Sequence, residues 1–274
     1  MMKKILLIVS CIFIFLGVAF VGTGLYLGVK RYEKVTRDVN GEFLSVSIDI
    51  SSTDINIKKS ENGKAYIVAK ESDKVKYNLS IENDTLLIKE KDTRKWYDHI
   101  EINLFESVYC NLYLPANTYD NLKIKASSSN VASENSEIAF NTATITLSSG
   151  NVNLSSKVLT SLSIKTASGN LKIKNNTLND LTATASSGNI YLNNVIATTS
   201  LKATTSSGNI TLKSCDSNSI TLKVSSGNVN CKLLTGKLFE TKAGSGNISC
   251  PASTAGNGTC KVTTGSGNIK ITIA

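Results

Sequence analysis

The sequence has few of the residues that anchor a compact core or build a catalytic site. Aromatic residues make up 6% of its 274 residues, and it contains two prolines, one tryptophan and one histidine. Six cysteines are present, but none forms a CxxC or a Cys/His pair at the spacing of a zinc site. Acidic residues, which general acid–base chemistry would need in a cluster, are few and scattered in the second half. We therefore expect no enzyme, no catalytic residue, no metal and no cofactor.

The positive charge is concentrated in residues 121–274. That part holds fourteen lysines and no arginine against five acidic residues, which is 14 − 5 = +9, and the whole chain also carries +9. A basic surface concentrates polyanions such as nucleic acid, anionic lipid or acidic polymers. The alternative, that solvated lysines only keep a repetitive β surface soluble and blunt its edges, stays open.

Residues 5–29 are apolar and uncharged, between Lys3-Lys4 and Lys30-Arg31. This length spans a hydrocarbon core of roughly 30 Å at about 1.5 Å per residue, so we predict a single-pass membrane anchor. Counting positive residues alone mildly favours a cytoplasmic location for the rest of the chain. Long downstream domains, however, are translocated largely regardless of charge, and Lys3-Lys4 with the apolar run resembles an export signal. We expect residues 1–4 in the cytoplasm and the remainder outside the cell membrane, where nucleic acid is not an expected partner.

A five-residue phrase of the Ser-Gly-Asn type recurs through the second half, for example at Ser186-Ser187-Gly188-Asn189-Ile190. Successive glycines are separated by 19, 19, 20, 19, 19 and 21 residues, and a fixed period of this size indicates stacked structural repeats. The glycine and asparagine of each copy are our candidate structural corner: Gly150, Asn151, Gly169, Asn170, Gly188, Asn189, Gly208, Asn209, Gly227, Asn228, Gly246, Asn247, Gly267 and Asn268.

Apolar residues alternate on both sides of the phrase, as in Leu162, Ile164 and Thr166 before Gly169 and Leu171 and Ile173 after it. Each run has the period of a β-strand, but the step across the phrase is odd, so the chain must turn there. We predict an all-β fold: a parallel β-solenoid of about 19–21 residues per coil, with two well-marked sides and a looser third, preceded by the membrane helix. The corner asparagines are expected to bond from coil to coil in one ladder.

The N-terminal part before the regular array is expected to form a cap. Residues 30–41 are predicted to be a linker, 42–120 a β cap with a first coil, and 121–274 the regular solenoid. Ser51 to Ile55 is a worn copy of the phrase. Asn62-Gly63 predicts one hairpin turn and Glu82-Asn83-Asp84 a second.

The cysteines give two further expectations. Coils stacked in chain order place Cys231 beside Cys250; two buried thiols are the simpler interpretation, and a disulfide stays open as the alternative. Cys215 falls on the looser third side, so we expect it to be the most exposed thiol.

Outward positions before the corner carry threonine and lysine. A flat sheet of this composition suits contact with a repetitive anionic polymer or glycan, through the candidate binding residues Lys202, Thr204, Lys223, Lys242 and Lys261.

The repeated Ser-Ser-Gly-Asn-Val/Ile phrases, the early copy at residues 51–55 and the step from Leu112 to Pro115 into Leu122-Lys123-Ile124 resemble the bacterial "putative adhesin" family. The resemblance implies a β-solenoid domain of unknown function, often attached to the cell envelope, and it transfers no catalytic motif. We therefore expect a membrane-anchored, extracytoplasmic, adhesin-like module that binds cell-envelope polymers or proteins without catalysis. The alternative is a regulator or sensor in a cell-envelope stress pathway that acts through a protein partner.

Overall fold

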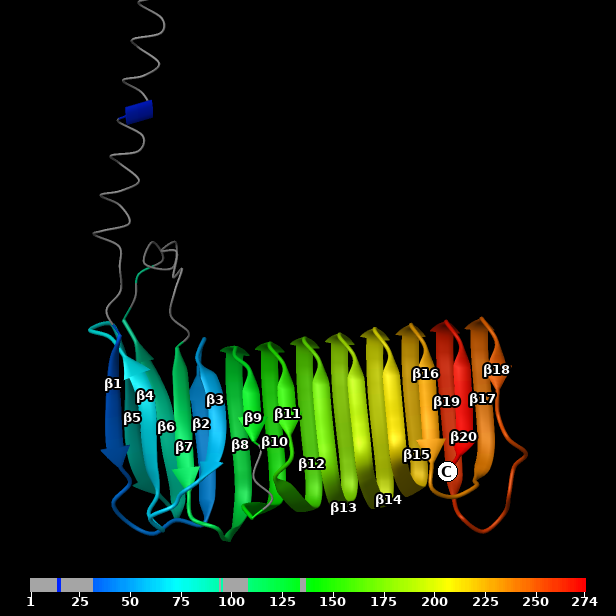
Figure 1. The fold of residues 1–274 in the computed structure, drawn as a ribbon, viewed down its shortest axis with the longest axis horizontal. Coiled ribbons are helices and arrows are strands. Elements are labelled where there is room, and N and C mark those ends of the chain that lie inside the picture. The colour runs from blue at the N-terminus through cyan, green and yellow to red at the C-terminus, as the bar shows by residue number, and fades with distance from the viewer. Residues whose placement is uncertain (1–13, 16–31, 94, 96–107, 134–136) are drawn as a thin grey trace, which may run out of the picture.

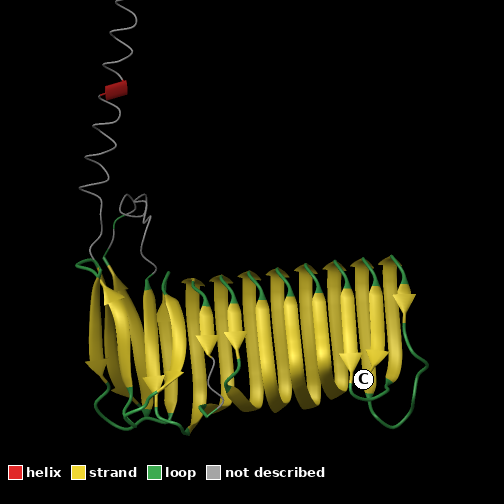
Figure 2. Cartoon of the chain, in the orientation of Figure 1, coloured by secondary structure: helices red, strands yellow, loops and turns green. Residues whose placement is uncertain are grey.

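The structure, a computed structural model, describes residues 14–15, 32–93, 95, 108–133 and 137–274. Within them the fold is all-β, with twenty strands stacked side by side along one long axis (Figures 1 and 2). The predicted anchor at 5–29 lies outside the described residues except for Ile14 and Phe15. In the part that is described, no helix is both long and apolar enough to cross a membrane.

The strands form two long sheets that meet at the Ser-Gly-Asn corner. The first sheet precedes the corner, and its strands lie in the order β5 (Val75–Glu82), β6 (Thr85–Asp92), β2 (Ser45–Ile50), β8 (Thr118–Ser128), β10 (Ala139–Ser149), β12 (Lys157–Ser168), β13 (Leu171–Ser187), β14 (Ile190–Ser207), β15 (Ile210–Ser226), β19 (Thr259–Ser266) and β17 (Leu238–Ser245).

The second sheet follows the corner and shares the long strands β13, β14 and β15, which continue from one sheet to the other. Its order is β1 (Glu33–Asp38), β4 (Tyr66–Glu71), β7 (Tyr109–Leu114), β3 (Asp54–Lys59), β9 (Val131–Ser133), β11 (Val152–Leu154), β13, β14, β15, β16 (Val229–Leu233), β20 (Ile269–Ile273) and β18 (Ile248–Ser249).

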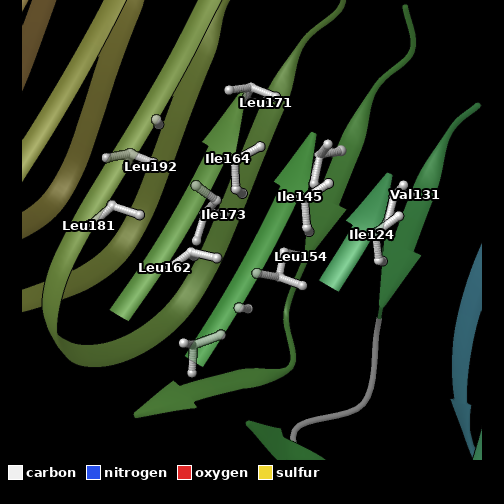
Figure 3. Close-up of a cluster of buried hydrophobic side chains, with 14 of the residues drawn as sticks. Ile124, Val131, Ile145, Leu154, Leu162, Ile164, Leu171, Ile173, Leu181 and Leu192 are labelled. Atoms are coloured by element: carbon white, nitrogen blue, oxygen red, sulfur yellow. The ribbon is translucent and has the colours of Figure 1, made fainter. Parts of the chain in front are cut away.

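The core lies between the two sheets and repeats from coil to coil. Leu162 and Ile164 point in from the first sheet and Leu171 and Ile173 from the second, all with at most 1% of their surface exposed (Figure 3). Because neighbouring coils align these positions residue for residue, as in Ile164 beside Ala183, each apolar row continues along the axis. The alternating pattern of the sequence is thus satisfied, with one residue in every two buried.

A third, shorter side closes the coils formed by β13, β14 and β15, and it begins at a second corner. Asn175, Asn194 and Ser214 take φ values of 52°, 55° and 53°, in the left-handed region that asparagine tolerates better than most residues. The coil of 20 residues places its extra residue at the end of this side, where the register shifts between Ala197 and Ser200.

The expected exposure of Cys215 is wrong. Cys215 is fully buried, because the third side is also an extended strand whose alternate side chains point inward. Burial raises the pKa of its thiol to about 11.

The coils do not stack in chain order at either end. At the C-terminal end the last coil, β19 and β20, lies between β15–β16 and β17–β18 (Figure 1). At the N-terminal end, β2 and β3 lie between β8–β9 and the strands β6 and β7 that come later in the sequence. At the C-terminal end the last coil of the chain is therefore buried between two neighbours, and a coil that is joined to the chain on both sides forms the end of the stack. At the N-terminal end the outermost strands are β5 in the first sheet and β1 in the second.

This order separates the two cysteines that chain order would have paired. Cys231 lies beside Ile271 of β20, and β18, which leads to Cys250, lies on the far side of β20. The expectation that Cys231 and Cys250 are stacked neighbours is therefore wrong, and both are free thiols.

The hairpin predicted at Asn62-Gly63 is wrong as well. β7 lies between the two strands, because β3 pairs with β7 in parallel and β4 pairs with the other edge of β7 antiparallel. The second hairpin is confirmed: β5 and β6 pair antiparallel around Asn83 and Asp84, whose φ values are 49° and 57°.

Buried polar contacts join the cap to the first coil. The hydroxyl groups of Tyr77 and Thr53 lie 2.7 Å apart, and Glu71 accepts a hydrogen bond from the backbone N–H of Tyr77 at 3.1 Å. Glu71 also pairs with Arg37 of β1 at 2.7 Å. Burial raises the pKa of the Tyr77 phenol, so the phenol stays protonated and keeps its hydrogen bond.

Candidate functional site

The corner glycines are required by two separate constraints. Gly188 has a φ of +147°, which L-residues with side chains rarely adopt, and the other corner glycines lie between +128° and +144°. In addition, a Cβ at Gly188 would lie 2.0 Å from the carbonyl oxygen of Gly169 in the neighbouring coil. The close approach of the coils, which sequence reasoning missed, therefore restricts this position as much as φ does. Ser129, before Asn130, stands where the later corners have glycine. It has no positive φ and is 98% buried, and its hydroxyl group has no hydrogen-bond partner among the described residues.

The corner asparagines form a continuous hydrogen-bonded ladder along the edge where the sheets meet. In the middle of it, Oδ1 of Asn189 accepts the backbone N–H of Asn209 at 2.8 Å, while the backbone N–H of Asn189 donates to Oδ1 of Asn170 at 2.9 Å. Asp54 of β3 begins the ladder by accepting the N–H of Asn130 at 2.9 Å. At the far end the ladder runs from Asn228 to Asn268 and only then to Asn247, following the spatial order of the coils. The ladder amides are thus engaged in holding coils together.

The predicted binding residues lie in two outward rows of the first sheet, at positions six and four residues before the corner. One row runs Lys202, Thr221, Lys261 and Glu240, and the other runs Thr204, Lys223, Thr263 and Lys242. All five predicted residues are therefore on one face, but Lys242 is separated from Lys223 by Thr263. Lys261 lies beside Glu240 and pairs with it at 2.6 Å. Since both side chains are more than half exposed, this ion pair adds little stability.

The same two rows extend along the first sheet as far as the cap, and they carry more lysines than the five residues predicted from the sequence. We call this surface the Thr/Lys face; its lysines, all exposed, are Lys89, Lys123, Lys125, Lys165, Lys202, Lys223, Lys242 and Lys261. Asp49 and Glu240 are the acidic residues of the two rows, so their net charge is 8 − 2 = +6. With strands about 4.8 Å apart, the face presents a line of positive charge along the whole solenoid.

The outward surface of the second sheet carries aromatic residues, which sequence reasoning did not place. Tyr66 and Tyr113 stack with ring centroids 4.5 Å apart, and Nζ of Lys58 lies 5.9 Å from the Tyr113 ring. Loss of hydration, with smaller contributions from Tyr113 and Glu61, raises the pKa of Tyr66. Farther along the sheet, Tyr191 lies between Lys172 and Thr211. We call this surface the Tyr/Lys face; neither row of the Thr/Lys face carries an aromatic residue.

Two surface hollows lie on these faces. One, of about 310 Å³, lies where the Thr/Lys face meets the β5–β6 hairpin, with Glu82 and Lys123 among its lining residues. The other, of about 480 Å³, surrounds Tyr191 on the Tyr/Lys face. In the part of the chain that is described, no three His, Cys, Asp or Glu side chains are grouped so that they could hold a metal ion.

The stacked parallel coils, the glycine corners and the asparagine ladder define a protein of the β-solenoid class. The chain belongs to the Toastrack DUF4097 family, whose model matches residues 44–160 and again 154–274. The resemblance to the "putative adhesin" family, drawn from the repeat, is thus confirmed. The family is defined by a domain of unknown function. No curated protein matches the chain.

Solved structures share the fold at low sequence identity. A Parabacteroides distasonis protein described as a "putative lipid binding protein" is 18% identical, with 89% of this chain and 98% of that chain covered and a TM-score of 0.56. A "putative adhesin" of the same organism is 13% identical, with 88% and 98% covered and a TM-score of 0.52. A "putative adhesin" of Parabacteroides merdae is 17% identical, with 88% and 97% covered and a TM-score of 0.51.

Proposed function

We propose that this protein is a non-enzymatic binding module that contacts an anionic polymer of the cell envelope through its Thr/Lys face. The observation that carries the proposal is the line of eight exposed lysines, which the coil order brings into two adjacent rows. A line of fixed charges on a rigid β surface matches an extended polyanion, because each coil adds the same contact at the next step along the axis. The names of the structural neighbours, adhesins and a lipid-binding protein, are consistent with a binding role.

The location outside the cell membrane is part of the same proposal. It is supported by the uncharged apolar stretch at 5–29 and by the charge of residues 121–274, which suits acidic envelope polymers. Treatment of intact cells with a protease tests it: cleavage within the solenoid supports an external location, and full protection of the solenoid contradicts it.

Binding is tested with the purified full chain, an anionic cell-wall polymer and polyphosphate as a probe that carries charge alone. Replacing Lys165, Lys202 and Lys223 by Gln removes three exposed contacts of about 0.5 kcal/mol each. Together they amount to about 1.5 kcal/mol, so we expect roughly tenfold weaker binding and a smaller dependence on salt.

The matched control removes the same charge from other surfaces of the molecule. Lys34, Lys64 and Lys157 are exposed and lie away from the Thr/Lys face, so replacing them by Gln should leave affinity nearly unchanged. Equal losses in the two triple variants would contradict a specific face. Binding that does not respond to salt would instead favour the regulator that acts through a protein partner.

A further inference from the structure

The hollow around Tyr191 lies on the opposite sheet from the Thr/Lys face. Its lining comes from two neighbouring strands, β13 and β14, and from the corner asparagines that precede them: Asn170, Leu171, Lys172, Lys174, Asn189, Tyr191 and Asn193. It is a shallow, open depression of about 480 Å³, so a ligand here rests on the surface of the sheet.

The second feature of this hollow is the aromatic ring of Tyr191. Tyr191 is half-buried on the outward side of β14, and no hydrogen bond, ring contact or cation contact joins it to another described residue. The equivalent positions of the neighbouring coils hold Lys172 and Thr211. High β-propensity explains a tyrosine in a strand, but it does not explain why the ring lines a hollow between polar neighbours.

The charges around the ring are positive and uncompensated. Lys172 lies directly beside Tyr191, and Lys174 and Lys213 flank Asn193 two residues farther along the strands. No ion pair joins these three lysines to any described residue. The stretches that pass through this surface, 151–155, 170–174, 189–193, 209–213, 228–232 and 268–272, contain no aspartate or glutamate.

We propose that this hollow binds a sugar ring that carries an anionic group, a carboxylate or a phosphate. The apolar face of a sugar ring packs on the Tyr191 ring, since aromatic side chains offer a large, rigid contact area. The anionic group is held by the ammonium groups of Lys172 and Lys174, and the side-chain amide of Asn193 is in reach of ring hydroxyls. This site is separate from the Thr/Lys face, which has no ring to offer and selects charge alone.

The probes separate the ring from the charge. Tetragalacturonate carries a carboxylate on each sugar, glucose 6-phosphate carries a phosphate, maltotetraose is neutral, and polyphosphate has charge without a sugar. With the full chain, calorimetric titration is expected to show binding of at least one anionic sugar and none of maltotetraose. If neither anionic sugar binds, or if maltotetraose binds equally well, the proposal is wrong.

The variants test the residues. Tyr191→Ala should weaken binding of the anionic sugar about tenfold, whereas Tyr191→Phe, which keeps the ring, should bind within about twofold of the parent. Lys172→Gln with Lys174→Gln should give a similar loss. Because these side chains point outward, the midpoint of thermal unfolding should not move, and a variant that binds weakly with an unchanged midpoint supports the site.

A matched pair on the other sheet distinguishes this site from the proposed function. Lys202→Gln with Lys223→Gln removes the same charge from the Thr/Lys face. This variant should bind polyphosphate more weakly, and its affinity for the anionic sugar should stay within about twofold of the parent. Tyr191→Ala should instead bind the anionic sugar more weakly and keep its affinity for polyphosphate. If the two double lysine variants lose affinity for the anionic sugar equally, charge alone explains binding and the Tyr191 site is refuted. This outcome does not depend on whether the Thr/Lys face binds a polymer.

Discussion

The order of the C-terminal coils predicts which engineered cysteines can form a disulfide. Thr263 on β19 lies directly beside Lys223 on β15, and Lys242 on β17 lies one strand farther away. With strands about 4.8 Å apart, the Cα atoms of Lys223 and Thr263 are about 4.8 Å apart, and those of Lys223 and Lys242 about 9.6 Å. A disulfide needs roughly 4.4–6.8 Å, so only the first pair can close.

The energetic consequence is large enough to measure. A bridge from position 223 to position 263 closes a loop of about 40 residues, which in the chain-entropy model stabilises the folded state by about 4 kcal/mol. At about 2–4 °C per kcal/mol for a chain of this size, the midpoint of thermal unfolding should rise by about 10 °C after oxidation. The pair Lys223→Cys with Lys242→Cys, the matched control, should stay reduced and unshifted.

The assay needs a background without reactive native thiols. Cys250 is only partly buried and Cys11 lies outside the described residues, so both are replaced by Ser. The remaining cysteines are buried, and burial raises the pKa of Cys110 and of Cys260 to about 12, which keeps them as unreactive thiols. Efficient closure of the 223–242 pair, with none of the 223–263 pair, would show that the coils stack in chain order and refute the reasoning.

Three further predictions concern the corner and the core. Asn189→Ala loses three side-chain hydrogen bonds at an exposed position, so it should lower the free energy of unfolding by about 1.5 kcal/mol. The control Asn247→Ala, at the end of the ladder, should change the free energy of unfolding very little. If Asn189→Ala instead abolished ligand binding and left stability unchanged, the structural role of the ladder would be contradicted. Gly188→Ala should cost about 3 kcal/mol or more in denaturant unfolding, since it combines backbone strain with a 2.0 Å approach to a carbonyl oxygen; Gly63→Ala, with open space around it, should cost clearly less. Burial raises the pKa of Cys260 in the folded state from 9.0 to about 12, so the stability that its protonated thiol contributes is complete below pH 9 and is lost as pH rises toward 12. Under reducing conditions, the free energy of unfolding should therefore fall less steeply between pH 9 and 12 in Cys260→Ala than in the parent protein. An identical slope in the two proteins would refute this prediction.

The repeat could be predicted from the sequence because every element of it is local. The odd step across Ser-Gly-Asn places the turn, and the alternation on either side assigns Leu162 and Ile173 to the core, both of which are buried. Cys215 was misassigned because the third side has no recurring motif. Its inward pattern, with Val195 in the preceding coil, is visible only when the coils are aligned on that side.

The binding surface could be predicted in part. Lysines and threonines before the corner follow directly from strand alternation, so the five predicted residues do share a face. Their neighbours do not follow, because the sequence cannot show that Thr263 separates Lys223 from Lys242. The hollow at Tyr191 was missed for a similar reason: one tyrosine among polar residues stands out only when Lys172 is seen beside it.

The sequence by itself determined the coil: its length, the residue types of its Ser-Gly-Asn corner, the buried rows on either side of that corner and its basic outward surface. Only the tertiary structure decided which coil lies next to which. Because all coils present the same inward rows and the same ladder asparagine, local interactions are equally satisfied in several orders, and long-range packing selects one. Ile248 and Ile269 occupy the same position in their coils, yet Ile248 is 45% exposed and Ile269 is 1% exposed. The fold buries the chain's last coil and leaves at the end one that is joined to the chain on both sides.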